Sequence, residues 1–499
     1  MSSSPIDYSV KLPNVYAIGC TGESSLADEG MCRRAIERFL TEQLRVADRI
    51  LYGVSSLSEG GNLVFSESCI ALGIQLRVLL PLARDRFLSE SSAPVRGRFE
   101  QVIDNAMSVE VAGSEESPDE GRYERGLQTV QLCQELLAVW DGHPPENLGD
   151  TGEIVAFAGQ MHRPVTWIHS ETGAVQTIQQ RGEQDVAPEE ELNFLNSLPS
   201  AGTVVEADSR TALIQSWLAK LDSNAAQLAP QVRKLAAGPI VCTALAAFVS
   251  AATQTVHSSG AWMAAGGALL GLTAAALPAV LRLGKRQALW VRIRTAAEVS
   301  RSVSALWDTP VRYQVVGPEI LPELNSMIRS LDFLKAQAGR QNKIGLVQFK
   351  EQYLKVRLLD QMGYFLRQSV HSASMGRRYR LVSKVCAAVA ILVLVWTFSS
   401  RYLMKPSHPA PGEGWLPLVA SALFQVATVA GALLVVNECE RRERRYKEIH
   451  RSLADWEVEL RAFHTWPPVI EVVSKIERAL LVELLEWRSL LKNMKMPRN

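Results

Sequence analysis

Hydrophobic positions follow two different patterns along the chain. Between residues 15 and 168, short apolar runs alternate with amphipathic stretches of helix length, such as residues 30–46 and 121–135. Short apolar runs separated by helices are typical of buried strands in a parallel sheet, so this pattern predicts a Rossmann-like, doubly wound α/β domain. The predicted strands cover residues 15–18, 49–52, 76–80, 107–111, 136–140 and 165–168.

The second pattern consists of long apolar runs with almost no charge. They cover residues 239–256, 262–283, 381–399 and 415–436. At about 1.5 Å of rise per residue, runs of roughly 18 to 22 residues cross a hydrocarbon core about 30 Å thick. The sequence therefore predicts a helical module with four transmembrane helices in two hairpins. The alternative is a helical hairpin buried inside a large soluble core.

Basic residues gather on one side of the predicted spans. They follow the second span, precede the third and follow the fourth, whereas the hairpin tips carry only Arg401 and Lys405. Because cytoplasmic loops of membrane proteins are enriched in Lys and Arg, both termini are predicted to be cytoplasmic. The start of the chain lacks the basic and apolar regions of a cleaved signal peptide, so the internal spans are expected to direct insertion.

These patterns divide the chain into seven predicted segments. In chain order they are an N-terminal tail (1–13), the α/β domain (14–170), a polar linker (171–208), an amphipathic helix with the first hairpin (209–284), a cytoplasmic helical segment (285–380), the second hairpin (381–437) and C-terminal cytoplasmic helices (438–499). Because the amphipathic helix runs directly into the first span, we expect it to transmit a shift of the α/β domain to the membrane.

Glycine-rich loops are predicted at the carboxyl ends of several strands, where parallel sheets bind ligands. Glycine lets the backbone approach a ligand closely, and the amides at a helix start favour phosphate. Each loop alone could be an ordinary turn, but together they predict a site for a nucleotide. The predicted ligand-binding residues are Gly19, Thr21, Gly22, Ser55, Ser58, Glu59, Gly60, Gly61, Asp141, Gly142, Gly149, Asp150 and Thr151.

Two parts of the chain resemble known families. Residues 14–170 resemble the SLOG family of nucleotide-sensing domains from bacterial conflict systems, through the motifs at residues 19–22, 57–61, 79–82, 138–142 and 149–153. The chain departs from that pattern at Glu23-Ser24 and at Gly61-Asn62. Residues 320–495 resemble the SLATT family of membrane effector modules, through the motifs at residues 353–365, 378–380 and 449–461.

This double resemblance implies a membrane effector of anti-phage defence. The implied ligand is a nucleotide second messenger, either a cyclic nucleotide or an ADP-ribose-like molecule, and no other cofactor is expected. The protein is expected to assemble as a homo-oligomer among the lipids of the bacterial inner membrane. Ligand binding would then lead it to form a pore or disrupt that membrane.

Composition narrows the range of functions further. A formal net charge of +1 over 499 residues argues against a nucleic-acid partner, which requires a basic face. Seven cysteines without a CxxC pair or a His/Cys cluster predict neither disulfides nor a metal site, as suits a reducing cytoplasm. The centres of the predicted spans lack charged residues, which disfavours ion-coupled transport.

Polar stripes run along two of the predicted spans. They comprise Thr243, Ser250 and Gln254 on the first span and Ser421, Gln425 and Thr428 on the fourth. In an oligomer these stripes could line a narrow water path, or they could simply form hydrogen bonds between helices. Ala427 and Gly431 are small residues four positions apart, which predicts close helix packing.

Carboxylates at the sheet edge leave a catalytic alternative open. Glu59, Asp141, Asp150 and Glu153 could attack a glycosidic carbon, or they could bind ribose hydroxyls and stabilise a helix start. We predict no catalytic residue among them. Besides the ligand-gated effector, two interpretations stay open: a membrane-tethered nucleotide hydrolase or N-glycosidase, and a constitutive channel or scaffold with a vestigial sensor domain.

Overall fold

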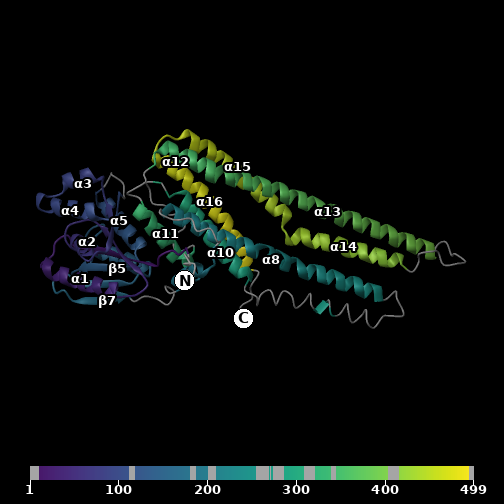
Figure 1. Ribbon diagram of the computed structural model, residues 1–499, viewed down its shortest axis with the longest axis horizontal. Coiled ribbons are helices and arrows are strands. Elements are labelled where there is room, and N and C mark those ends of the chain that lie inside the picture. Colours follow the sequence, from purple (N-terminus) through teal and green to yellow (C-terminus); the bar gives the residue numbers. More distant parts are fainter. Residues whose placement is uncertain are drawn as a thin grey trace, which may run out of the picture. The chain divides into compact units, whose positions relative to one another are not determined.

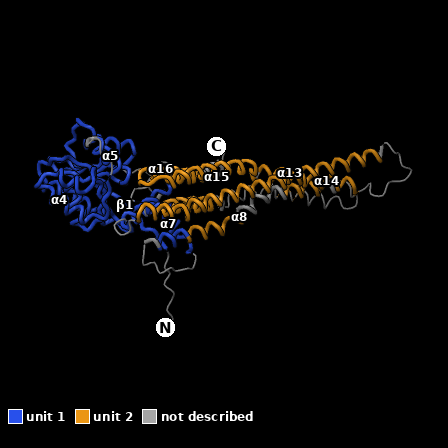
Figure 2. The backbone as a smooth tube through the Cα atoms, turned by 90° about the horizontal axis from the view of Figure 1, so that it is seen from above, with its two compact units in different colours: residues 1–218, 306–343 blue, residues 219–305, 344–499 orange. Residues whose placement is uncertain are grey.

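The chain forms two compact units (Figure 2). The computed structural model describes residues 10–111, 118–179, 187–200, 210–253, 269, 271–272, 286–307, 309, 321–338, 344–402 and 415–493. The first unit consists of residues 1–218 and 306–343, and the second consists of residues 219–305 and 344–499. Both units are therefore assembled from two separate stretches of sequence.

A single mostly parallel sheet organises the first unit. Among the described residues its strands are β1 (Val15–Gly22), β2 (Ile50–Ser56), β3 (Gln75–Leu80), β4 (Ser108–Val111), β5 (Glu135–Trp140), β6 (Val165–His169) and β7 (Val175–Gln179). Their order is β4-β3-β2-β1-β5-β6-β7, and only the β6–β7 pair is antiparallel. The six predicted strands are confirmed, and the direction of the strand order reverses between β1 and β5.

Helices cover both faces of this sheet (Figure 1). The helices of the first unit are α1 (Glu29–Leu44), α2 (Gly61–Ala71), α3 (Arg84–Glu90), α4 (Ala93–Asn105), α5 (Pro118–Leu132), α6 (Thr151–Gln160), α7 (Ala187–Ser197), η2 (Pro322–Leu324) and α11 (Asn325–Ala338). Residues of α1, α2 and α4 share one core with Ile18 of β1, whereas residues of α5, α6 and α11 share another with its neighbour Ala17. The doubly wound arrangement predicted from the sequence is therefore present.

The interval 171–208, which we expected to be a polar linker, contains two ordered elements. β7 is an edge strand whose Val175 and Ile178 stay about half exposed, so it lacks the apolar run that marks a buried strand. α7 buries Leu195 completely, although the helix begins with a run of acidic residues, Glu189–Glu191. Asn196 also donates a hydrogen bond to the carbonyl of Leu12 and accepts one from its amide, both at 2.9 Å.

Helix α11 lies between the predicted hairpins in sequence but packs in the first unit. The ring of Phe333 lies 5.2 Å from that of Tyr52, inside the core beneath β1 and β2. The hydroxyl of Ser330 donates a hydrogen bond of 2.6 Å to the carbonyl of Pro13. A segment that we had assigned to a separate cytoplasmic module thus completes the α/β domain.

A buried ion pair holds α11 to the sheet. Arg77 of β3 is 2% exposed and contacts Asp332 of α11 and Glu110 of β4, each at 2.5 Å. Burial by itself would lower the pKa of Arg77, but Asp332 and Glu110 outweigh burial and raise it. Removing one partner from such a pair typically costs about 3–5 kcal/mol, because the other charge is left buried and unpaired.

The described part of the second unit is helical. Its elements are α8 (Arg210–Thr253), which begins in the first unit, α10 (Arg286–Ala305), α12 (Leu346–Tyr353), the π-helical turn η3 (Leu354–Leu358), α13 (Leu359–Tyr402), α14 (Leu416–Val436), α15 (Cys439–Ala462) and α16 (Trp466–Asn493). The boundary between the units falls inside α8, after residue 218. The predicted amphipathic helix is therefore part of a longer helix that continues into the first apolar run.

Helix α13 forms a hairpin with α14 and α15 (Figure 1). The hydroxyl of Ser383 on α13 donates a hydrogen bond of 3.0 Å to the carbonyl of Ala427, and Ala427 itself is buried. Small residues of α14 therefore permit close packing within one chain. In contrast, Leu392, Trp396 and Phe398 of α13 are each more than 60% exposed. An apolar surface of this length suits contact with lipid tails.

Two helical stretches among the described residues are long and apolar enough to span a membrane, rather than the four predicted. They are Leu346–Ser400 and Leu416–Ala462, judged by length and composition. The first predicted run, residues 239–256, is helical as far as Thr253. Most of the second run, residues 262–283, lies outside the described residues. The structure thus includes the second hairpin and leaves the first as a prediction.

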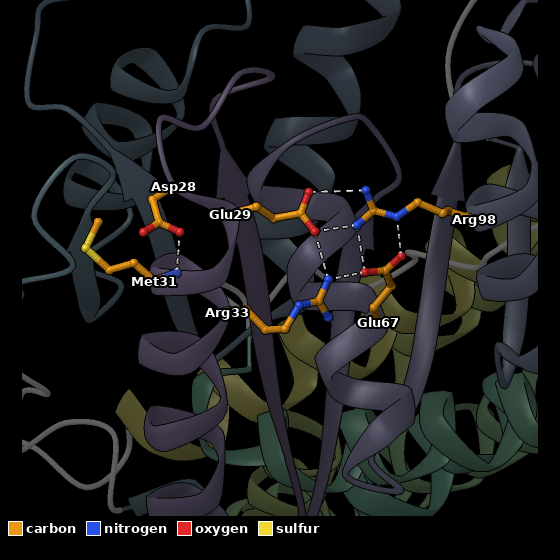
Figure 3. Close-up of polar contacts among 6 residues, drawn as sticks. All are labelled: Asp28, Glu29, Met31, Arg33, Glu67 and Arg98. Atoms are coloured by element: carbon orange, nitrogen blue, oxygen red, sulfur yellow. Dashed lines mark hydrogen bonds and ion pairs between the residues drawn. The ribbon is translucent and has the colours of Figure 1, made fainter.

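Four charged side chains join α1, α2 and α4 (Figure 3). Arg33 of α1 and Arg98 of α4 each contact both Glu29 of α1 and Glu67 of α2, at 2.5 to 2.9 Å. Burial alone would raise the pKa of Glu67, but hydrogen bonds from Arg98 and Arg33 outweigh burial and lower it. The network therefore stabilises this face of the domain while Glu67 is ionised.

Glu67→Gln is expected to lower the free energy of unfolding by about 1 kcal/mol at neutral pH, as a networked ion pair is lost. The folded-state pKa of Glu67 lies below its ordinary value of 4.5, so its contribution is complete above pH 4.5 and disappears as the pH falls through the folded-state pKa. Thermal unfolding of the full chain in detergent between pH 7 and pH 3 measures this. Glu42→Gln, which removes an exposed pair on α1, is the control, and equal effects of the two variants would contradict the prediction.

Candidate functional site

The carboxyl ends of β1, β2 and β5 lie next to one another, at the point where the strand order reverses. Gly22 at the end of β1 is in register with Val139 of β5. The amide of Glu23 donates a hydrogen bond of 3.1 Å to the carbonyl of Val139, and the carbonyl of Glu23 accepts one of 2.9 Å from Gly61. The loops that we predicted to bind a ligand after these strands are thus connected through their backbones.

Three of the predicted residues lie inside β1 and not in the loop after it. The strand runs four residues beyond its predicted end and therefore includes Gly19, Thr21 and Gly22. A Cβ atom on Gly19 would lie 2.9 Å from the methyl group of Thr129 on α5. Gly19 is therefore explained by the packing of α5 on the strand. Ser55 is likewise a buried residue inside β2.

Glycines allow the start of α2 to touch the end of β1. A Cβ atom on Gly22 would lie only 2.9 Å from the Cα atom of Gly61. Gly60 has a φ of +73°, and a Cβ atom there would overlap the carbonyl oxygen of Glu23. The close approach of strand and helix requires glycine at these positions, whether or not a ligand binds there.

Asn62 organises the loop between β2 and α2. Its side-chain amide donates hydrogen bonds to Ser56 at 3.3 Å and to Ser58 at 2.8 Å. Its Oδ1 atom is buried and has no hydrogen-bond partner among the described residues. Glu59, which we predicted to contact a ligand, is exposed and accepts a hydrogen bond of 3.2 Å from Ser92.

Glu23 and Asp141 form a carboxylate pair at the same edge. The amide of Asp141 donates a hydrogen bond of 2.7 Å to Glu23 Oε1, and Asp141 itself contacts the amide and the Nδ1 atom of His143. The backbone hydrogen bond from His143 lowers the pKa of Asp141. Burial, together with the negative charge of Asp141, raises the pKa of Glu23. The sequence predicted a role for Asp141 but not for Glu23. The only feature of the sequence that pointed to Glu23 is its position directly after β1.

The loop before α6 is closed by its own carboxylates. Asp150 Oδ2 accepts hydrogen bonds from the amides of Glu146 at 3.0 Å and Asn147 at 2.7 Å. Glu153 accepts one of 2.8 Å from the amide of Gly149. These contacts favour structural roles for Asp150 and Glu153 over the catalytic alternative.

The other predicted residues of this loop region are Gly142, Gly149 and Thr151. Gly142 and Gly149 have φ values of +92° and +83°, which glycine adopts without strain. A Cβ atom on Gly142 would lie 3.3 Å from the ring of Trp167, which limits larger residues there. Thr151, the first residue of α6, is buried.

A buried arginine that the sequence did not predict lies on α5. Arg125 is 6% exposed, and its Nε and Nη1 atoms have no hydrogen-bond partner among the described residues. Burial, aided by the nearby charge of Arg122, lowers its pKa to about 10, and Glu124 opposes this only in part. From sequence alone, a basic residue in an amphipathic helix is expected to face solvent. The burial of Arg125 could therefore not be predicted and is seen only in the folded domain.

The polar stripe predicted on the first span lies partly outside the described residues. Thr243 and Ser250 belong to α8, where Thr243 is exposed, and Gln254 lies beyond its described end. The structure therefore does not bring these three residues together into a described site.

The polar stripe predicted on the fourth span lies on α14. Ser421 and Gln425 are half-buried, and Thr428 is exposed. The hydroxyl of Thr428 donates a hydrogen bond of 2.8 Å to the carbonyl of Phe424 in its own helix. This hydroxyl is therefore satisfied without a partner helix, and a lining role for the stripe stays a prediction.

Hydroxyl and amide groups accompany the carboxylates at the sheet edge. Among the residues that the structure describes, no group of three or more His, Cys, Asp or Glu side chains could hold a metal ion. The hydroxyl and amide groups can donate hydrogen bonds to phosphate oxygens, and the carboxylate of Asp141 can accept them from sugar hydroxyls.

Comparisons with known proteins identify no family for this chain. No protein-family model matches it, and a search of curated proteins found no match. The fold therefore defines its class: a Rossmann-like parallel α/β domain followed by a helical region with two long apolar helices.

Gly60→Ala is expected to destabilise the chain far more than Gly73→Ala. Both glycines have φ near +70°, where alanine costs roughly 1–2 kcal/mol. Only at Gly60 would the added Cβ overlap a backbone carbonyl, whereas no described atom lies within 4 Å of a Cβ at Gly73. Melting temperatures of the two variants test this, and equal decreases would show that the contact between β1 and α2 is not tight.

Proposed function

We propose that this protein is a membrane effector that binds a nucleotide-derived signal through its α/β domain and then opens a pore in, or otherwise breaches, the bacterial inner membrane during phage infection. One observation supports this proposal above all others. A single chain combines a loop cluster at the switch point of a doubly wound sheet with a helical hairpin whose outer surface is apolar and exposed.

The loop cluster has the position and the chemistry that a nucleotide needs. Ligands of doubly wound sheets bind where the strand order reverses, which here is between β1 and β5. Asp141 could accept hydrogen bonds from ribose hydroxyls, and Ser58 and Thr151 offer hydroxyls for phosphate oxygens. A cyclic nucleotide or an ADP-ribose-like molecule matches this combination of sugar and phosphate partners.

The chain connections between the two units could transmit a change from one to the other. The chain passes between the units after residues 218, 305 and 343, and the first crossing lies inside α8. The segment between the second and third crossings contains α11, which the Arg77–Asp332 pair fixes to the sheet. To move an equilibrium from 1:99 to 99:1, the ligand must favour the active arrangement by about 5.5 kcal/mol.

The membrane part of the proposal combines structure with sequence. The hairpin of α13 and α14 supplies two spans, and residues 239–256 and 262–283 would supply two more. Basic residues such as Arg378 and Arg444 adjoin the spans on the side that we assign to the cytoplasm, where anionic lipid headgroups would hold them. Assembly of several copies would be needed to surround a path through the membrane.

Release of a trapped dye from liposomes tests this proposal. The full chain is reconstituted into liposomes that contain anionic lipid, and ADP-ribose or a cyclic nucleotide is added outside. We expect one of these nucleotides to raise the leakage rate at least tenfold and Asp141→Asn to weaken the response, while the exposed Glu42→Gln responds as the unsubstituted chain does. Absence of leakage with a nucleotide that demonstrably binds contradicts the proposal, as does leakage that is independent of nucleotide.

The Glu23–Asp141 pair favours a second candidate, a membrane-tethered nucleotide hydrolase. Two carboxyl groups whose environments move their pKa values apart can share the work of acid and nucleophile. Here Glu23 has the raised pKa and would donate a proton, while Asp141 has the lowered pKa and stays ionised.

Chromatography of the products formed from ADP-ribose tests whether the protein is a nucleotide hydrolase. A general acid acts only while protonated, so turnover should fall as the pH rises through the raised pKa of Glu23. Glu23→Gln should then abolish turnover, whereas Glu42→Gln should not change it. Leakage without any product would reject the hydrolase and leave the effector proposal intact.

A further inference from the structure

Arg125 differs from the other deeply buried arginines that the structure describes. The guanidinium of Arg77 pairs with Asp332, and that of Arg357 pairs with Glu477 at 2.8 Å. Arg125 is almost as buried, yet its Nε and Nη1 atoms have no partner among the described residues. Burying an unpaired guanidinium is strongly unfavourable, and the lowered pKa of Arg125 reflects this. Such a residue becomes favourable when an anion binds to it.

The backbone places Arg125 beside the carboxyl end of β1. On α5, Thr129 packs over Gly19, with its methyl group 2.9 Å from where a Cβ of Gly19 would be. α5 runs antiparallel to β1. One helical turn from Thr129 back to Arg125 covers about the same distance as two residues of strand, so Arg125 lies at the level of Thr21. The loop before α6 reaches the same part of α5, since a Cβ on Gly149 would lie 3.0 Å from its backbone.

Hydroxyl groups lie beneath this part of α5. Alternation along β1 puts Thr21 on the same face as Ala17, and alternation along β2 puts Ser56 on the same face as Val54. Both of these core residues belong to the face that α5 covers. β1 and β2 are in register as far as Cys20 and Ser55, so Thr21 and Ser56 directly follow the last paired residues of the two strands. The side-chain amide of Asn62 donates to the hydroxyl of Ser56. The Oδ1 atom of the same amide is buried and has no hydrogen-bond partner among the described residues.

We infer that Arg125 binds a phosphate group of the nucleotide proposed above, with the hydroxyls of Thr21 and Ser56 as additional donors. The planar guanidinium matches the spacing of two phosphate oxygens, and a charge-assisted hydrogen bond inside a domain is stronger than one in water. The identity of the ligand as a nucleotide rests on the proposed function. The binding of a phosphate group does not depend on any activity toward the membrane.

Thermal unfolding of the full chain in lipid nanodiscs, with and without inorganic pyrophosphate, tests this inference. An anion that binds only the folded chain raises its melting temperature. We expect this rise in the unsubstituted chain and in Arg122→Met, which removes an exposed charge from the same helix. In Arg125→Met the rise should disappear, with at least a tenfold loss of affinity for pyrophosphate, and Arg125→Lys should retain part of it.

The melting temperature without pyrophosphate gives a second readout. Arg125→Met replaces an unpaired buried charge by an apolar side chain of similar length, so it should melt at a higher temperature than the unsubstituted chain. If Arg125 only stabilised the fold, Arg125→Met would instead melt at a lower temperature than the unsubstituted chain. A lower melting temperature of Arg125→Met, or an unchanged response of this variant to pyrophosphate, would overturn the inference.

The liposome assay separates this inference from the proposed function. If ADP-ribose releases dye equally well with Arg125→Met and with the unsubstituted chain, the inference fails and the proposed function stands. If pyrophosphate binding depends on Arg125 but no nucleotide releases dye, the inference stands and the proposed function fails.

Discussion

The direct contact between Gly22 and Gly61 is the constraint on which the proposed site depends. Because neither residue has a side chain, the start of α2 touches the end of β1, with less than 3 Å between the Gly61 Cα atom and where a Cβ of Gly22 would be. This approach lets the amide of Gly61 donate to the carbonyl of Glu23, whose side chain in turn accepts from Asp141 after β5. Loops from separate parts of the sequence are thereby joined at the switch point of the sheet.

Among the described residues, buried charge is paired in one part of the first unit and unpaired beside the carboxyl edge of the sheet. Arg77 on β3 is a compensated buried charge, because it pairs with Asp332 and so fixes α11 to the sheet. At the carboxyl edge, Arg125 has no such partner among the described residues, and the hydroxyls of Thr21 and Ser56 lie on the face that its helix covers. α11 and the loops after β1, β2 and β5 are therefore attached to the same sheet. Under the proposed function, binding at the loops would act through this sheet on the chain segments that lead to the membrane helices.

The sequence predicted the parts of the fold that repeat a simple pattern. Six strands were recognisable because each is a continuous apolar run, and β7 was missed because half-exposed edge residues such as Ile178 interrupt that signal. The placement of α11 could not be predicted, since an amphipathic helix shows which face it buries but not against what. The glycine-rich loops were found by residue type alone. Glu23 and Arg125 were not, because burial and the lack of a partner are properties of the folded domain.

Hydrogen–deuterium exchange of the full chain in lipid nanodiscs, with and without ADP-ribose, tests the central claim most directly. If a nucleotide binds at the switch point, backbone amides in residues 19–25, 56–62 and 141–151 should exchange more slowly when it is present. Exchange in β7, at the far edge of the sheet, should stay unchanged. Unaltered exchange in all three loops under a nucleotide concentration that slows exchange elsewhere in the chain would contradict the account.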